Sequence, residues 1–329
     1  MEYSDLITKL LEGDTRAAAR LITIVENDID AAETIINSIY QKTGKAYILG
    51  ITGAPGTGKS TFISTLTKTF VNQGNKIGII CVDPTSPLTG GALLGDRIRM
   101  KQHFTLERVF IRSMANRGQL GGLARATEDV IKILDAYGCD IIIIETVGVG
   151  QSEVDIFKSA ESVVVLLVPG LGDEIQAIKA GIMEITDIFV VNKMDLPGAD
   201  RKIAEISQML ELNSSFKYHS NQLRKEYSKL LTWTPEIVKV NSKTGENFEE
   251  LLEIIQKHKK FLEDTGVISN YLKNRIKSET LQILRYKLQK KVENLLNSNR
   301  EDIERYINEV IERSLDPYSL ANLIIKKLL

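Results

Sequence analysis

The sequence predicts an α/β protein with a doubly wound, mostly parallel β-sheet. From residue 46 onward, seven short apolar runs follow one another: AYILGIT, KIGIICVD, RVFIRS, CDIIIIET, SVVVLLVP, DIFVVNK and IVKVNS. These runs alternate with stretches of helical periodicity. They also lack the apolar–polar alternation of a half-exposed strand, which suits parallel strands covered by helices on both faces. Together these observations indicate a doubly wound sheet.

Helical segments precede and follow the predicted sheet. Residues 4–42 predict two or three short helices, one of them capped by Asp14 or Thr15 with apolar positions at Ala18, Leu21, Ile22 and Val25. Strand signals stop after Lys260, and residues 271–329 have helical spacing at Leu281, Leu284, Leu288, Val292 and Leu295. Asp316 and Pro317 predict the start of a last helix. The apolar stripe could pack on its own domain or on a second subunit.

We therefore predict three regions: an N-terminal helical extension (1–43), a P-loop domain (44–262) and a C-terminal helical region (263–329). The chain has 329 residues, and its net charge is -1, so it lacks the strongly basic character of a nucleic-acid-binding protein. Its start has no apolar signal core, and no apolar run approaches the ~20 residues that span a bilayer. We expect a soluble, cytoplasmic protein. Cys81 and Cys139 are expected to be reduced, partly buried thiols, and the three separated histidines do not predict a zinc site.

The segment GAPGTGKST, residues 53–61, fits the phosphate-binding pattern G-x-x-x-x-G-K-[ST] between a predicted strand and a predicted helix. The glycines allow backbone N–H groups to turn toward phosphates, and Lys59 adds a positive charge. The Ser60 hydroxyl is placed to bind magnesium. The predicted phosphate-binding residues are Gly53, Ala54, Pro55, Gly56, Thr57, Gly58, Lys59, Ser60 and Thr61.

Two later segments predict recognition of guanine. NKMD, residues 192–195, ends with Asp195, whose carboxylate can accept hydrogen bonds from the ring N–H and the amine of guanine, whereas adenine has no such donors. NSKTGENF, residues 241–248, resembles the Ser-Ala-Lys loop that contacts guanine through its backbone, with Asn and Ser in place of Ser and Ala. The predicted base-binding residues are Asn192, Lys193, Asp195, Asn241, Ser242 and Lys243, and the expected nucleotides are GTP and GDP.

Three carboxylates are candidates for a magnesium site near Ser60. Asp83 and Glu145 each end a predicted strand, and Asp96 lies in a predicted loop. Magnesium keeps several waters, so Glu145 could act through one of them; Asp83 and Asp96 could instead cap helices. Gly148 and Gly150 follow Glu145 and allow the backbone motion of a γ-phosphate sensor. A second candidate switch spans residues 169–181, with Asp173, Gln176 and Lys179, although these residues alone favour a solvated helix start.

The ordered set of motifs resembles the MeaB/ArgK-type GTPases, which are metallochaperones associated with methylmalonyl-CoA mutase. The matching segments are GAPGTGKST, DPTSPLTGGALLGDRIRM, RSMANRGQLGGLA, ETVGVGQSE, PGLGDEIQAIKAG and NKMD, together with the leader LLEGDTRAAARLITIVEND and Trp233. The resemblance runs from about the first helix to about His258. Glu145 in ETVGVGQSE is a hallmark of this family, whose fold is the SIMIBI type of P-loop NTPase.

The resemblance implies roles for individual residues. Ser60, Asp83, Asp96 and Glu145 would serve magnesium, and the residues implied in catalysis are Lys59, Asp96, Glu145 and Lys179. Asp173, Gln176 and Lys179 match a switch through which family members sense the mutase. The family further implies a homodimer, held partly by the C-terminal helices, that uses GTP to gate adenosylcobalamin delivery to the mutase and to protect it. Neither a nucleic acid nor a membrane is an expected partner.

Hydrolysis is expected to be slow without the partner, because the nucleotide loops contain no obvious arginine finger or general base. The older family label of LAO/AO transport system kinase is not supported, since the chain has no HRD or DFG kinase motif. Two alternatives remain open: a metal-insertion chaperone, which the sparse Cys and His residues disfavour, and a GTP-dependent switch for a different client.

Overall fold

The computed structural model describes residues 3–83, 108–115, 122–146, 159–170, 186–212 and 233–328. Within these ranges, the seven apolar runs form seven strands of one sheet, in the order β3-β2-β4-β1-β5-β6-β7, and neighbouring strands are parallel. This confirms the predicted fold class. The strands are β1 (Tyr47–Gly53), β2 (Ile77–Asp83), β3 (Val109–Ala115), β4 (Ile141–Thr146), β5 (Ser162–Leu167), β6 (Ile188–Asn192) and β7 (Glu236–Val240).

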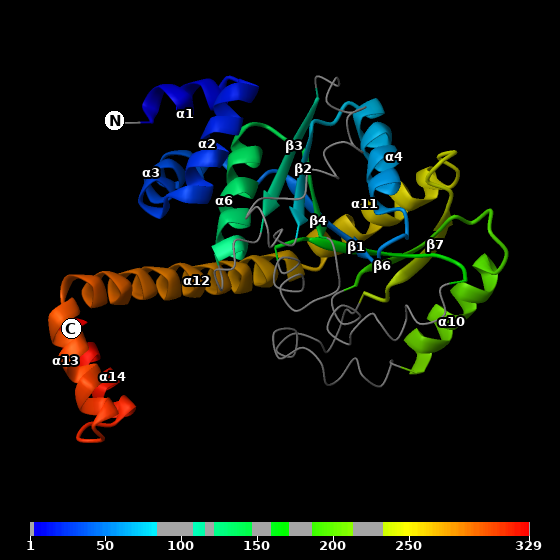
Figure 1. Cartoon of the computed structure of the whole chain (residues 1–329). Helices are drawn as coiled ribbons and strands as arrows, with labels where there is room; N and C mark the ends of the chain where they lie inside the picture. Colours follow the sequence, from blue (N-terminus) through cyan, green and yellow to red (C-terminus); the bar gives the residue numbers. More distant parts are fainter. Residues whose placement is uncertain are drawn as a thin grey trace. The chain divides into compact units, whose positions relative to one another are not determined.

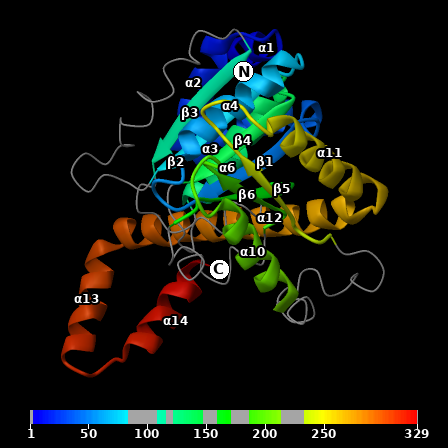
Figure 2. The ribbon, with the colours of Figure 1, turned by 90° about the vertical axis from the view of Figure 1, so that its right-hand side faces the viewer.

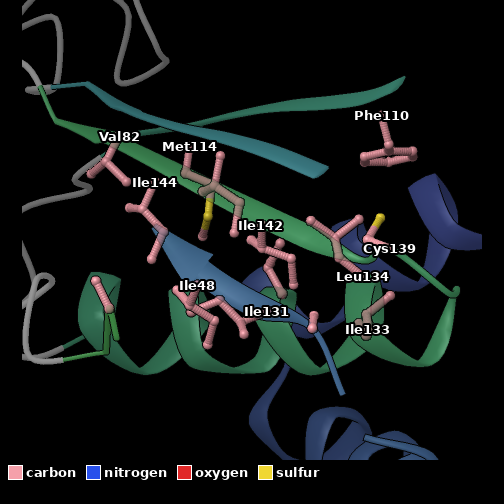
Figure 3. Packing of buried hydrophobic residues seen from close by; sticks show 14 of the residues in the cluster. Ile48, Val82, Phe110, Met114, Ile131, Ile133, Leu134, Cys139, Ile142 and Ile144 are labelled. Carbon is pink, nitrogen blue, oxygen red and sulfur yellow. The ribbon is translucent and has the colours of Figure 1, made fainter. Parts of the chain in front are cut away.

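Helices cover both faces of the sheet. The helices α4 (Lys59–Asn72) and α11 (Phe248–Asp264) share one core cluster with the strands, and in Figure 2 they lie on the viewer's side of the sheet. The helix α6 (Gly122–Ala136) covers the other face, where Ile48, Ile142 and Ile144 point toward it (Figure 3). Successive residues of the central strands β1, β4, β5 and β6 therefore enter opposite cores, which explains why their runs lack apolar–polar alternation. The helix α10 (Ala199–Leu212) follows β6 and packs against β6 and β7.

The N-terminal helices pack beside α6 (Figure 1). Asp14 caps α2 by accepting a hydrogen bond of 2.7 Å from the backbone N–H of Ala17, and the four predicted apolar positions of α2 are buried. An ion pair between Glu26 and Arg112 joins α2 to β3. The elements of this region are α1 (Ser4–Leu11), α2 (Thr15–Asn27), α3 (Ile29–Ile39) and a 3-10 turn, η1 (Tyr40–Lys42).

The carboxylate of Asp135 fixes the backbone segment that leads into β1. It accepts hydrogen bonds from the backbone N–H groups of three consecutive residues, Gly44, Lys45 and Ala46, with a distance of 3.1 Å to Ala46. Asp135 lies near the end of α6, so this contact connects that helix to the start of the central strand. The phosphate-loop segment begins at the opposite end of the same strand.

Glu128 forms a buried ion pair with Arg275. The guanidinium donates to one carboxylate oxygen from Nη2 at 2.7 Å and from Nε at 3.2 Å, and Ser159 contacts the other carboxylate oxygen. Burial by itself raises the pKa of Glu128, but the positive charges of Arg275 and Lys132 outweigh it and hold the pKa below its ordinary value. The pair joins α6 to the first turns of α12 (Val267–Ser298).

The chain divides into two compact units, Met1–Arg275 and Ile276–Leu329. The second contains the rest of α12, followed by α13 (Arg300–Ile311) and α14 (Pro317–Leu328). Asp316 caps α14, as predicted, by accepting hydrogen bonds from the N–H groups of Tyr318 and Ser319. Leu281, Leu284 and Leu288 are exposed on α12. Among the described helices, none combines the length and the apolar composition needed to cross a bilayer.

Candidate functional site

The predicted phosphate loop connects the central strand β1 to α4. Gly56 and Gly58 have φ values of 88° and 89°, a backbone conformation that glycine adopts at low cost. Thr57 is fully buried and closes the turn through bonds from its N–H and its hydroxyl to the carbonyl of Ala54. The Lys59 ammonium donates to the carbonyl oxygens of Gly53, at 2.8 Å, and Ala54, at 3.3 Å. The backbone of the loop therefore holds the ammonium group of Lys59 through two carbonyl oxygens.

Asn192, at the end of β6, connects this loop to the predicted base-binding segments. Its side chain is almost fully buried, and its amide nitrogen donates to the carbonyl of Thr57 at 2.8 Å. Its amide oxygen accepts from the N–H of Ser242, at 3.2 Å, and from the Ser242 hydroxyl, at 2.7 Å. The next residue, Lys193, donates to the carbonyl of Gly56 at 2.9 Å. Three segments far apart in the sequence are thus joined at one place.

The segment after β7 forms a tight turn. Asn241 accepts a hydrogen bond at 3.0 Å from the N–H of Lys243, so its short polar side chain organises the loop. Thr65 on α4 donates to the carbonyl of Ser242 at 2.7 Å. This contact was missed at the sequence level, because Thr65 lies inside a helix and carries no local signal of a partner 177 residues away. The Ser242 hydroxyl itself adds a bond to Asn192 that an alanine could not make.

Replacing Ser242 with Ala should weaken GTP binding about two- to tenfold, because one hydrogen bond to the buried Asn192 amide is lost while the backbone bond remains. Isothermal titration of both proteins with GTP would measure the change. The exposed Thr244→Ala substitution in the same loop is the matched control. A Ser242→Ala protein with wild-type affinity would contradict the contribution of this hydroxyl.

Two of the predicted magnesium residues, Asp83 and Glu145, lie at the carboxyl ends of β2 and β4. Glu145 is almost fully buried, pairs in register with Ile51 of β1 and Cys81 of β2, and accepts a hydrogen bond from the Cys81 thiol. Asp83 is the last residue of β2. Ser60 is half-buried in the first turn of α4. A hydroxyl and a carboxylate are oxygen ligands of the type that magnesium prefers, so these residues fit such an ion.

The remaining predicted residues fall into two groups. Asp195 and Lys243 are exposed after β6 and β7, where a base could reach them, and Pro55 and Thr61 are exposed at the phosphate loop. Asp96, Gly148, Gly150, Asp173, Gln176 and Lys179 lie outside the described residues. The two cysteines are free and buried, as expected, and burial raises the pKa of the Cys139 thiol to about 12.

A family model described as "Methylmalonyl Co-A mutase-associated GTPase MeaB" matches residues 18–297. The chain belongs to the MeaB family of GTPases. It is 52% identical over 324 residues to a protein of Pyrococcus horikoshii named "Putative GTPase PH0274", covering 98% of each chain. It is 30% identical over 312 residues to the GTPase ArgK of Escherichia coli, covering 94% of this chain and 90% of that one.

The fold of this MeaB-family GTPase is similar to the crystal structure of an LAO/AO transport system kinase. The TM-score is 0.65 at 24% sequence identity, and the match covers 99% of this chain and 97% of the other. At that identity the likeness concerns the fold, and it agrees with the predicted P-loop architecture. The matched region includes residues 53–61, whose sequence has the phosphate-binding pattern.

Proposed function

We propose that this MeaB-family GTPase is a GTP-dependent chaperone of an adenosylcobalamin-dependent acyl-CoA mutase, with methylmalonyl-CoA mutase as the expected client. The family description names that mutase as the associated enzyme. The observation that carries the nucleotide part of the proposal is the Asn192 side chain, which joins the phosphate loop to the loop after β7. GTP would control the delivery of adenosylcobalamin to the mutase and the protection of the mutase by the chaperone.

In the proposed complex, the loop N–H groups and the Lys59 ammonium bind the phosphates. Lys59 is already held at the loop by two carbonyl groups, so its charge needs little reorganisation to meet an anion. Asp195 accepts the two guanine donors, and the backbone of residues 241–243 contacts the guanine oxygen. Asp195 is exposed, which leaves its carboxylate accessible to a base. Equal binding of ATP and GTP in a competition assay would contradict this assignment.

Ser60, Asp83, Asp96 and Glu145 would hold magnesium, directly or through water. Bound magnesium would neutralise charge on the β- and γ-phosphates. The Glu145 carboxylate supports this part of the proposal, because it lies near the end of the central strand β4 and offers oxygen atoms of the kind that magnesium prefers.

We further propose that the chain forms a homodimer through the C-terminal region, residues 263–329, beyond a P-loop domain of residues 44–262 and an N-terminal extension of residues 1–43. The exposed leucines 281, 284 and 288 support this, since they recur at helical spacing along α12. Sedimentation equilibrium of the full chain would measure its mass directly, and a monomeric mass at micromolar concentration would contradict the dimer.

The chaperone proposal is tested by GTP turnover, measured for the protein alone and with methylmalonyl-CoA mutase or isobutyryl-CoA mutase from the same source. We expect slow turnover alone and clear stimulation by one of the two mutases. The Lys179→Ala variant should lose the stimulation and keep GTP binding, because Lys179 belongs to the proposed partner-sensing switch. Intact GTP binding without stimulation by either mutase would leave a GTPase with a different client and would overturn the mutase assignment.

A further inference from the structure

Cys81 and Glu145 lie side by side at the end of the central sheet. The two residues are register partners in the parallel pair of β2 and β4. The Cys81 thiol donates to Oε2 of Glu145 across 3.7 Å, and both side chains are 2% exposed. A thiol is a weak donor, but in a buried setting even a weak donor restricts the orientation of a carboxylate.

This pair is on the face of the sheet that α4 covers. Cys81 packs in the same core as Ile51 of β1 and Phe62 and Ile63 of α4. Because side chains alternate along a strand, Glu145 lies on the same face as Ile143, which is also in that core. The first turn of α4 carries Ser60, the predicted magnesium ligand. The thiol therefore contacts the carboxylate on the side of the sheet where the phosphate loop leads into its helix.

We propose that Cys81 is a positioning residue that orients the Glu145 carboxylate toward the magnesium–nucleotide site. The inference rests on the proposed role of Glu145 in serving magnesium. The thiol hydrogen bond fixes one carboxylate oxygen, which reduces the number of orientations that the carboxylate must lose when magnesium and GTP bind. Cys81 touches neither magnesium nor nucleotide in this proposal and acts only through Glu145.

The test measures binding of a non-hydrolysable GTP analogue, in EDTA and in saturating magnesium, by fluorescence titration. The quantity compared between variants is the factor by which saturating magnesium increases the affinity for the analogue, which we call the magnesium gain. We expect Cys81→Ala to reduce this gain roughly three- to tenfold, the range that corresponds to one modest hydrogen bond, without changing the affinity in EDTA. Cys81→Ser keeps a donor on the same carbon and should keep the gain within about twofold of wild type.

Cys139→Ala is the matched control, because Cys139 is also a free, buried cysteine but lies in the core on the α6 side of the sheet (Figure 3). It should leave the magnesium gain unchanged. A second comparison uses Glu145→Gln as the background, in which Cys81→Ala should cause no additional loss. Independent losses would mean that Cys81 does not act through Glu145.

The outcomes separate this inference from the proposed function. If Glu145→Gln leaves the magnesium gain intact, the role of Glu145 is wrong and the inference falls with it. If Glu145→Gln lowers the gain but Cys81→Ala does not, or lowers it equally in both backgrounds, the positioning role is overturned while the role of Glu145 stands. A loss in Cys81→Ser as large as that in Cys81→Ala would also overturn the inference, since the donor is retained.

Discussion

Replacing Arg275 with Met should lower the free energy of unfolding by about 3–5 kcal/mol, because it removes the main counter-ion of the buried Glu128 carboxylate. The Glu128 side chain is only 7% exposed, and its carboxylate accepts two hydrogen bonds from the Arg275 guanidinium. Methionine keeps much of the apolar length of arginine, so the loss reports mainly on charge. Urea unfolding at pH 7 would measure it.

The effect should depend on pH in a defined direction. The pKa of Glu128 is held below its ordinary value of 4.5 in the folded protein. The stabilisation is therefore fully present above about pH 4.5 and is lost as the pH falls through the lower pKa of the folded state. Without Arg275, burial would instead favour the protonated acid. The deficit of the variant should consequently be largest near neutral pH and smaller in acid.

Arg201→Met is the matched control for this experiment. Arg201 forms an ion pair with Glu205, at 3.2 Å, but its side chain is 85% exposed, so solvent screens the interaction. We expect a change within about 0.5 kcal/mol. Equal stabilities of the Arg275→Met and Arg201→Met proteins would show that the buried pair contributes no more than an exposed one.

Replacing Gly58 with Ala should weaken GTP binding on the order of 100-fold, because the new methyl group would displace the side chain that joins the nucleotide loops. A Cβ at this position would lie 2.8 Å from the amide nitrogen of Asn192. Since that nitrogen donates to the carbonyl of Thr57, relieving the contact would displace Asn192 from a buried hydrogen bond. Titration with GTP would measure the loss.

Gly56→Ala separates this contact from backbone strain. Gly56 has nearly the same φ as Gly58, 88° against 89°, but a Cβ there meets no atom within 4 Å. Both variants carry the cost of a left-handed alanine, about 1–2 kcal/mol. The difference between them therefore reports on Asn192. Indistinguishable affinities of the two variants would contradict its role.

The centre of the sheet was predictable because its strands β1, β4, β5 and β6 are buried on both faces. Such strands are mainly apolar, so the run CDIIIIET identifies β4 without any knowledge of its neighbours. The cap at Asp14 was likewise visible, since its partner is three residues away. The C-terminal region was predicted to be helical, but the break between α12 and α13 at Asn299 was not predicted. Nothing in the sequence near Asn299 excludes a continuous helix.

The candidate site was only partly predictable from its motifs. The motifs identified the loops of residues 53–61, 192–195 and 241–248, since each has a fixed local pattern. The contacts between the loops were not visible in the sequence. The bond from Thr65 to Ser242 and the contact of Cys81 with Glu145 join residues 177 and 64 positions apart. Such pairings depend on strand order and register, which no single segment encodes.

The strand order also bears on how the protein is made. The central strand β1 is the first to be synthesised, yet its neighbours are β4 and β5, which begin at residues 141 and 162. The phosphate-loop strand therefore stays unpaired through much of translation, and such non-local pairing is slow. The loop that meets Asn192 comes later still, at residues 241–243. We expect nascent chains that end before this loop to bind GTP weakly, so that the nucleotide stabilises the domain only after nearly all of it has been synthesised.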